Sequence, residues 1–178
     1  MTTWVALLRG VNVGGITIRS ADLAALFRDE LGFLEVRTFL ASGNVRFESD
    51  AAANARDTLK GSIEKALRAR YGYDAWIVLV TLEEMQRAID EFPFDSADET
   101  RQPWVVFCVD TATRDELTAA AASVDSALDP VRGGTGVVYW NPPKGSSTDT
   151  PFAKILAKTT YKSRTSNRNL RTLVKIAV

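Results

Sequence analysis

Residues 35–49 read EVRTFLASGNVRFES, and this stretch decides the fold of the first half of the chain. Two strand-like runs flank the tripeptide Ser42-Gly43-Asn44. Small polar residues and glycine between two such runs are typical of a β-hairpin. The stretch therefore predicts two neighbouring antiparallel strands.

The segments on either side of the hairpin complete a β-α-β-β-α-β order. The consecutive apolar residues of TWVALL (3–8) indicate a strand that is central or covered on both faces, and DAWIVLV (74–80) indicates a closing strand. Two helices are predicted from apolar residues at helical spacing, namely Leu23, Leu26, Phe27 and Leu31 before the hairpin and Leu59, Ile63 and Leu67 after it. We therefore expect an α+β protein whose residues 1–80 form a ferredoxin-like split βαβ domain.

The rest of the chain predicts a second, smaller α+β unit. Residues 81–102 are expected to be a connecting helix, opened by a capping box of Thr81 and Glu84, followed by a polar, proline-bounded linker. Residues 103–178 suggest a related β-α-β-β-α order, with a second capping box at Thr113 and Glu116. A last helix is expected to begin at Asn167, so that the basic segment ends in helices.

Composition excludes several kinds of site. The chain of 178 residues has no histidine, which excludes Ser-His-Asp and Cys-His mechanisms and any metal site built on imidazole. The single cysteine, Cys108, lies in an apolar stretch and is expected to pack as a small hydrophobic residue. Apolar runs are too short to cross a membrane and no signal peptide is visible, so we expect a cytoplasmic protein without metal or cofactor.

Several stretches in order along the chain resemble a bacterial family, domain of unknown function 1697. They are WVALLRGVNVGG (4–15), LGFLEVRTFLASGNVRF (31–47), AIDEFPF (88–94) and NRNLRTLVKIA (167–177). The resemblance implies a two-part α+β fold with ferredoxin-like character and implies no activity. The family usually has a tryptophan and an asparagine where this chain has Leu170 and Arg171. If that tryptophan stacks on a ligand, this contact is lost here; if it only packs, leucine can replace it.

The loop after the first strand is the first candidate for ligand contact. Glycines there, with Gly14 and Gly15 adjacent, lack the Lys-Ser/Thr ending of a phosphate-binding P-loop and do not fit the dinucleotide spacing. Arg9 and Asn12 nevertheless offer hydrogen-bonding groups to a ligand. The alternative is that the glycines only provide backbone freedom where the strand leaves the sheet.

The basic C-terminal segment is the second candidate. Residues 83–129 carry twelve acidic and three basic side chains, whereas residues 130–178 carry nine basic ones and a single acidic one. Lys144 precedes a predicted helix, and Arg168 and Asn169 would lie in the first turn of the last helix, where an anion is favoured. Either this segment pairs with the acidic middle of the chain, or it binds an external anion.

Three hypotheses for function follow. The leading one is a non-catalytic module that binds a nucleotide, a phosphorylated metabolite or RNA through Arg9, Asn12, Gly14, Gly15, Lys144, Arg168 and Asn169. The second is a small histidine-independent enzyme that acts on a phosphorylated or carboxylated substrate. The third is a homo-oligomeric scaffold. The sequence alone leaves the ligand, any reaction and the oligomeric state open.

Overall fold

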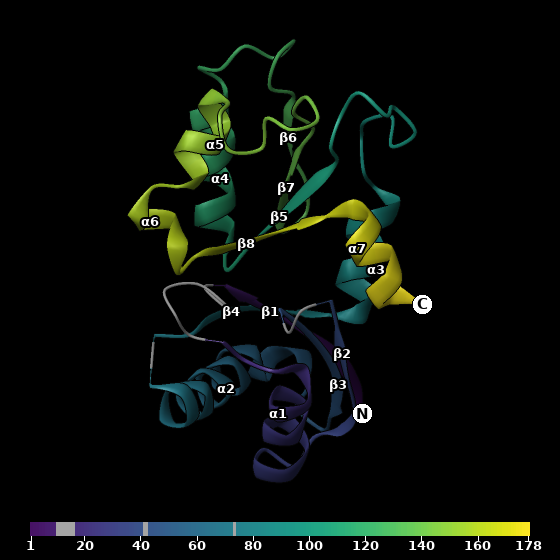
Figure 1. Cartoon of the computed structure of the whole chain (residues 1–178), viewed down its shortest axis with the longest axis vertical. Coiled ribbons are helices and arrows are strands. Elements are labelled where there is room, and N and C mark those ends of the chain that lie inside the picture. Colours follow the sequence, from purple (N-terminus) through teal and green to yellow (C-terminus); the bar gives the residue numbers. More distant parts are fainter. Residues whose placement is uncertain (10–16, 41–42, 73) are drawn as a thin grey trace. The chain divides into compact units, whose positions relative to one another are not determined.

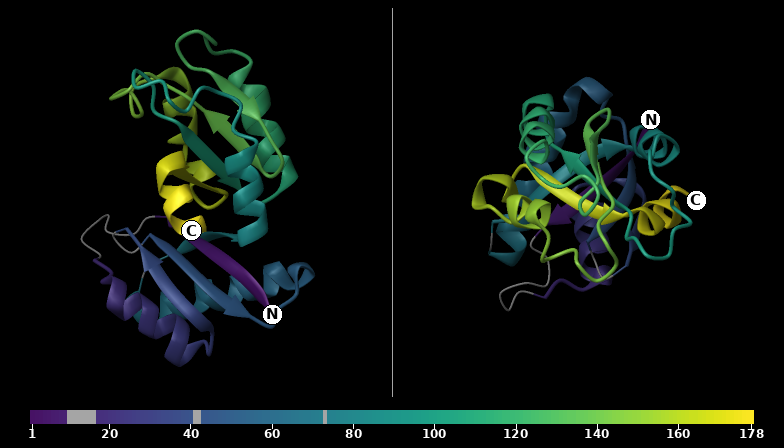
Figure 2. Two further views of the ribbon diagram at one scale, coloured as in Figure 1. Left: turned by 90° about the vertical axis from the view of Figure 1, so that its right-hand side faces the viewer. Right: turned by 90° about the horizontal axis from the view of Figure 1, so that it is seen from above.

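A computed structural model of the chain describes residues 1–9, 17–40, 43–72 and 74–178. They form two compact units, one made of Met1–Met85 together with Lys175–Val178 and the other of Gln86–Val174. The chain passes between the units within α3 (Leu82–Asp90) and within α7 (Leu170–Ala177). Figures 1 and 2 show the secondary structure of each unit.

The first unit contains one four-stranded antiparallel sheet in the order β2-β3-β1-β4. Its elements are β1 (Thr2–Arg9), α1 (Ser20–Ala25) continued by the π-helical turn η1 (Leu26–Glu30), β2 (Leu34–Phe39), β3 (Asn44–Ser49), the 3₁₀ turn η2 (Ala53–Ala55), α2 (Arg56–Tyr71) and β4 (Trp76–Thr81). The helices α1 and α2 lie on one face of the sheet (Figure 1). This order and connectivity are those of a split βαβ fold, so the ferredoxin-like prediction is confirmed.

Alternation along β1 explains its central position. Trp4, Ala6 and Leu8 point toward the helices, while Val5 and Leu7 point to the opposite face, and all five are buried. A strand buried on both faces needs the unbroken apolar run seen in the sequence. Burying one large apolar side chain contributes about 1.5–3 kcal/mol, so this strand is a main source of stability.

An aromatic cluster fixes the hairpin against the helices. Phe47 of β3 stacks on Phe33 with ring centroids 4.4 Å apart and meets Phe27 edge to face at 5.3 Å. The turn at residues 41 and 42 lies outside the described residues. The two strands that flank it pair in the predicted way, from Phe39 opposite Asn44 to Leu34 opposite Glu48.

A β-bulge interrupts β2. Leu34 pairs with Glu48 and Arg37 with Arg46, so β2 uses three steps where β3 uses two. Glu35, within the bulge, has a φ of 48°, a left-handed conformation that is unfavourable for residues other than glycine. Because β2 is an edge strand, the bulge also disturbs the edge that another strand would have to join.

The second unit repeats the topology of the first. Its sheet is antiparallel in the order β6-β7-β5-β8, which matches β2-β3-β1-β4 when the strands of each unit are numbered along the chain. Its elements are β5 (Trp104–Cys108), α4 (Thr111–Ala121), β6 (Val131–Gly133), β7 (Val137–Trp140), α5 (Pro151–Leu156), α6 (Thr159–Lys162) and β8 (Thr165–Asn169). The fold is therefore α+β with two related units.

Two local predictions for the second unit are wrong. The helix expected from Asn167 begins at Leu170, because residues 165–169 pair with β5 as strand β8. The expected capping box of Thr113 and Glu116 does not form, because Asp110 is the N-cap and accepts a hydrogen bond from the Thr113 amide at 2.8 Å. By contrast, the capping box of Thr81 and Glu84 is confirmed by reciprocal hydrogen bonds of 2.9 and 3.1 Å.

A buried carboxylate joins the elements of the second core. Asp129 is fully buried and accepts hydrogen bonds from Trp140 Nε1 at 2.5 Å and from the Phe152 amide at 2.7 Å. It thereby connects the segment before β6 to β7 and to the first turn of α5. Phe152 packs edge to face on Trp140 beneath these bonds, with ring centroids 5.5 Å apart.

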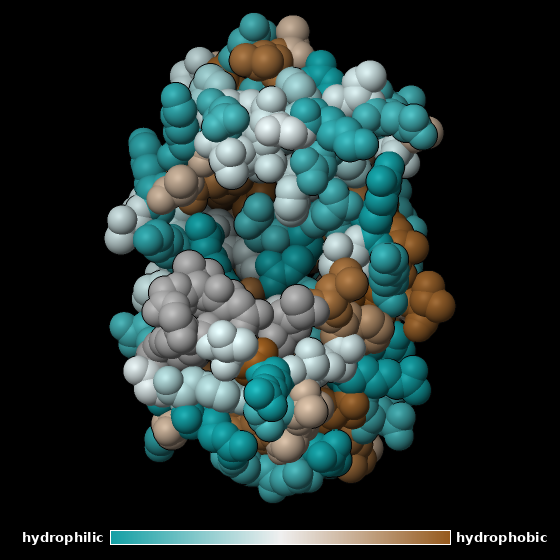
Figure 3. All heavy atoms as spheres, in the orientation of Figure 1, coloured by the Kyte–Doolittle hydropathy of each residue, from teal (hydrophilic) through white to brown (hydrophobic). Residues whose placement is uncertain are grey.

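On the face that Figure 3 shows, the surface of the described residues is mainly polar. Hydrophilic side chains predominate over α1 and α2 on the face shown in Figure 3, and apolar atoms there form small separate areas. Among the described residues, no helix is both long and apolar enough to cross a membrane. The large apolar side chains that are exposed are Met1, Leu34, Leu40, Leu128, Val174 and Val178.

Candidate functional site

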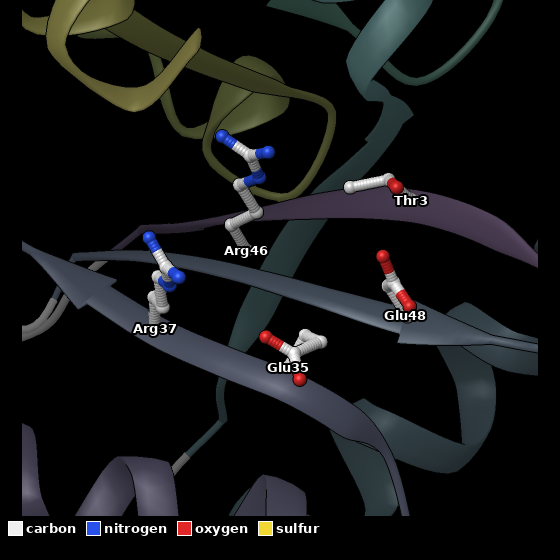
Figure 4. A pocket seen from close by; sticks show the side chains of 5 residues that line it. All are labelled: Thr3, Glu35, Arg37, Arg46 and Glu48. Atoms are coloured by element: carbon white, nitrogen blue, oxygen red, sulfur yellow. The ribbon is translucent and has the colours of Figure 1, made fainter. Parts of the chain in front are cut away.

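A small polar pocket lies on the face of the first sheet that α1 and α2 leave uncovered. It has a volume of about 80 Å³ and is lined by Thr3 of β1, Glu35 and Arg37 of β2, and Arg46 and Glu48 of β3. Figure 4 shows the two arginines at one end of the pocket and the two glutamates at the other. All five lining residues are polar, and four of them are charged.

The strand register creates this arrangement. Arg37 and Arg46 are directly opposite each other across β2 and β3, and Glu48 is directly opposite Thr3 across β3 and β1. Side chains two positions apart on a strand point to the same face, so Arg46 and Glu48 both line the pocket. The bulge inserts Glu35 between Leu34 and Arg37 on the edge strand, and its carboxylate faces the same pocket (Figure 4).

The charges of the pocket are not paired with one another. Within the described part of the chain, none of the four charged side chains forms an ion pair. Arg46 uses Nη1 to donate to the main-chain oxygens of Ile176 and Val178, at 3.0 and 3.2 Å. It thus neutralises the C-terminal end of α7, which carries a partial negative charge. Among the described residues, its Nε and Nη2 have no hydrogen-bond acceptor, so they can donate to a ligand.

The structure places the predicted residues of the opening loop only in part. Arg9 is the last residue of β1, on the same sheet face as Thr3 but three rungs away, and it does not line the pocket. Burial lowers the pKa of its guanidinium below the ordinary value. Asn12, Gly14 and Gly15 lie outside the described residues.

The predicted C-terminal residues lie in the second unit. Lys144 is exposed in a turn after β7, and Arg168 and Asn169 are the last residues of β8 rather than the first of a helix. Arg168 Nη1 donates to Ser166 Oγ at 2.8 Å, and Asn169 Oδ1 accepts from the Arg171 amide at 3.0 Å. Arg168 and Asn169 are adjacent and lie directly before α7, and both side chains form hydrogen bonds within the second unit.

One basic side chain of the C-terminal segment does pair with the acidic middle. Arg164 donates two hydrogen bonds of 3.0 Å to Glu116, and its Nε donates to Thr113 Oγ1 at 3.0 Å. The hydrogen bond from Arg164 lowers the pKa of the Glu116 carboxyl. This pair supports the internal explanation for part of the charge asymmetry.

Neighbouring groups and burial shift the pKa values of several described side chains. The carboxyl groups whose pKa values depart from the ordinary range are all shifted downward: Glu84, Asp98, Asp110 and Glu116. Burial raises the pKa of the Cys108 thiol to about 12, so it stays protonated. Among the described residues, no group of three or more cysteine, aspartate or glutamate side chains is placed to hold a metal ion.

Comparison with known proteins now adds to this geometry. Residues 1–139 match a family described as "Protein of unknown function (DUF1697)". The chain belongs to this family. The match spans both sheets up to β7, and the expected resemblance is confirmed.

A solved structure shows the same fold over nearly the whole chain. The conserved bacterial protein SP0830 from Streptococcus pneumoniae superposes with a TM-score of 0.80 at 23% sequence identity, over 99% of this chain and 97% of that one. At this identity the likeness shows the fold alone. No curated protein matches the chain by sequence.

Sequence reasoning missed the residues of the pocket. Arg37, Arg46 and Glu48 look like the solvated face of a half-buried hairpin, which is the commonest reason for charges on alternate strand positions. The signal that distinguishes them is the pairing of arginine with arginine. This pairing depends on the register set at the turn of the hairpin, and the bulge in β2 shifts the register only beyond it, between Arg37 and Leu34.

Proposed function

We propose that the protein is a non-catalytic binding module whose first unit holds a small ligand by an anionic group placed between Arg37 and Arg46. The observation that carries the proposal is that these two arginines are direct cross-strand neighbours at one end of a polar pocket and form no ion pair with a described carboxylate. Like charges directly opposite on two strands destabilise a sheet. A bound anion would relieve this repulsion.

The chemistry of guanidinium suits this role. Each guanidinium presents several donors in a plane, and two of them can hold both oxygens of a carboxylate or two oxygens of a phosphate. Arg46 is already oriented by its bonds to Ile176 and Val178, so little of its conformational freedom is lost on binding. Arg37, exposed on the edge strand, would complete the contact.

The second unit uses the corresponding face differently. There Tyr139 of β7 is buried, donates its hydroxyl to Ala88 O at 2.8 Å and meets Phe92 edge to face at 5.6 Å. Arg132 of β6 lies over the ring of Phe94, 5.7 Å from its centroid. Side chains of the unit itself therefore occupy this face, which favours the first unit as the binding site.

Binding is favoured over catalysis by the state of the ionisable groups. A histidine-free enzyme that works by general acid–base catalysis is expected to use a carboxylate, lysine or tyrosine with a pKa tuned toward neutrality. The shifted carboxyls of the described residues move the other way, and the thiol is buried and protonated. The hydrogen bonds of Arg164 and Arg168 within the second unit likewise favour the pocket over the basic C-terminal segment.

Titration of the protein with acetate and with inorganic phosphate, followed by thermal unfolding and calorimetry, tests the proposal. A specific site gives saturable stabilisation, which reaches about 2.7 kcal/mol at a ligand concentration 100 times Kd. Arg37→Gln should abolish this stabilisation without unfolding the protein, since Arg37 is exposed. Arg68→Gln removes the same charge from α2, on the other face of the sheet, and should leave binding intact. Equal stabilisation of the two variants would contradict the proposal.

A further inference from the structure

We infer that the ligand of this pocket is a small zwitterion, an amino acid or a similar molecule that carries a cationic amine beside its carboxylate. The inference rests on the proposed function and adds to it the role of Glu35 and Glu48. Their carboxylates line the same pocket as the arginines, and their positions define a second, negatively charged end (Figure 4).

The spacing of the two ends fits a short molecule. Arg46 and Glu48 are two residues apart on one strand, which separates their positions by about 7 Å. Each would hold its partner group at about 3 Å, the ordinary length of a charge-assisted hydrogen bond. A carboxylate and an ammonium joined by one to a few carbon atoms therefore span the pocket.

The charge balance argues against a plain anion. Two guanidinium groups and two carboxylates leave the pocket without net charge, so a dianionic phosphate would be attracted at one end and repelled from the other. A zwitterion matches both ends at once, and complementary charge of this kind sets specificity more than raw affinity. Thr3, which can donate or accept, adds a neutral contact beside Glu48.

The size and shape of the pocket set an upper limit on what it encloses. Its volume is only about 80 Å³. The pocket therefore accommodates the charged groups and the few atoms between them, while any side chain of the ligand extends into solvent. We accordingly expect the affinity to depend little on the side chain of the ligand and strongly on the presence and spacing of its ammonium and carboxylate groups.

The strained backbone of Glu35 is consistent with a role in this site. A left-handed φ at a residue other than glycine costs free energy, and bulges that re-aim a side chain are frequent beside binding sites. Here the bulge places the Glu35 carboxylate at the negative end of the pocket.

Calorimetric titration with a matched series of small probes tests the inference. The series comprises acetate, methylamine, glycine, β-alanine and γ-aminobutyrate. We expect at least one zwitterion to bind about tenfold more tightly than acetate, and methylamine not to bind. Glu48→Gln should lower the affinity for that zwitterion to the affinity for acetate, while the affinity for acetate itself stays equal or rises. Glu30→Gln, an exposed change on η1, should leave the tenfold difference intact.

The outcomes separate this inference from the proposed function. If no probe shows binding that depends on Arg37, both the proposed function and the zwitterion inference are contradicted. If acetate binding depends on Arg37 but no zwitterion binds more tightly than acetate, the zwitterion inference is wrong and the anion site is still supported. The same conclusion follows if the tighter binding of a zwitterion persists in Glu48→Gln. If Glu48→Gln does not fold, Glu35→Gln on the edge strand provides the same test. This variant must likewise reduce the difference in affinity between the zwitterion and acetate.

Discussion

Arg56 and Glu84 connect the start of α2 to the start of α3 through two hydrogen bonds, at 2.9 and 2.6 Å. Arg56 also donates to Leu79 O at 3.2 Å and lies over the ring of the buried Trp4, 5.6 Å from its centroid. Glu84 in turn accepts from the Thr81 amide at the end of β4. One ion pair thus joins two helices and a strand edge.

The acid stability of the protein should depend on Glu84. Burial alone would raise the pKa of its carboxyl, but hydrogen bonds from Arg56 and Thr81 outweigh burial and lower it. Its contribution is therefore present above the ordinary pKa of about 4.3 and is lost as the pH falls through the lower native value. Glu84→Gln should lose about 1 kcal/mol at pH 7 and weaken the dependence of stability on pH below 5. Urea unfolding at several pH values measures both, with Glu99→Gln in the exposed linker as the control.

Removal of the buried Asp129 carboxylate should be among the costliest single changes. Asp129→Ala leaves Trp140 Nε1 and the Phe152 amide without acceptors in a dry environment. A buried unsatisfied donor costs about 1–3 kcal/mol, so a loss of about 3 kcal/mol in the free energy of unfolding is expected. Asp125→Ala, at an exposed position four residues earlier, should cost less than about 1 kcal/mol. Similar losses for the two variants would show that Asp129 is not a structural anchor.

The contrast between the two units explains how far the sequence predicts the fold. In the first unit, hydrophobic periodicity and turn residues agree, so strands and helices were predicted in the right order. In the second, β8 reads TSNRN, a polar segment without the apolar alternation of a strand. Its strand conformation comes from pairing with β5 at the edge of the sheet, a tertiary effect that local sequence does not encode.

The candidate site was less predictable than the fold for a related reason. Arg37 and Arg46 are nine positions apart, and only the register of the hairpin makes them direct neighbours. A slip of one residue would turn one of them to the core face. The residues chosen from the sequence, such as Arg9 and Lys144, were identified by residue type and local composition, and their role in binding stays a prediction.

Cys108 should be unreactive in the folded protein. Burial raises the pKa of its thiol to about 12, so at pH 8 only about one molecule in ten thousand carries the reactive thiolate. In the unfolded chain the pKa returns to about 8.5 and the thiolate becomes abundant. Reaction with a chromogenic disulfide at pH 8 should therefore be slow in buffer and fast in denaturing urea. Rapid labelling of the native protein would show that the end of β5 opens readily.

The strain at Glu35 should appear as a reversed preference between glycine and alanine. At ordinary strand positions a protein with glycine is less stable than one with alanine by about 0.5–1 kcal/mol, because glycine loses more backbone entropy on folding. At Glu35 the φ of 48° penalises any side chain, so Glu35→Gly should be more stable than Glu35→Ala by about 1 kcal/mol. Thr38, in the regular part of the same strand, provides the control, where Thr38→Gly should be less stable than Thr38→Ala. Urea unfolding of the four variants measures both differences. The same sign at both positions would show that the bulge carries no strain, and the backbone argument for Glu35 as a ligand-facing residue would then fall.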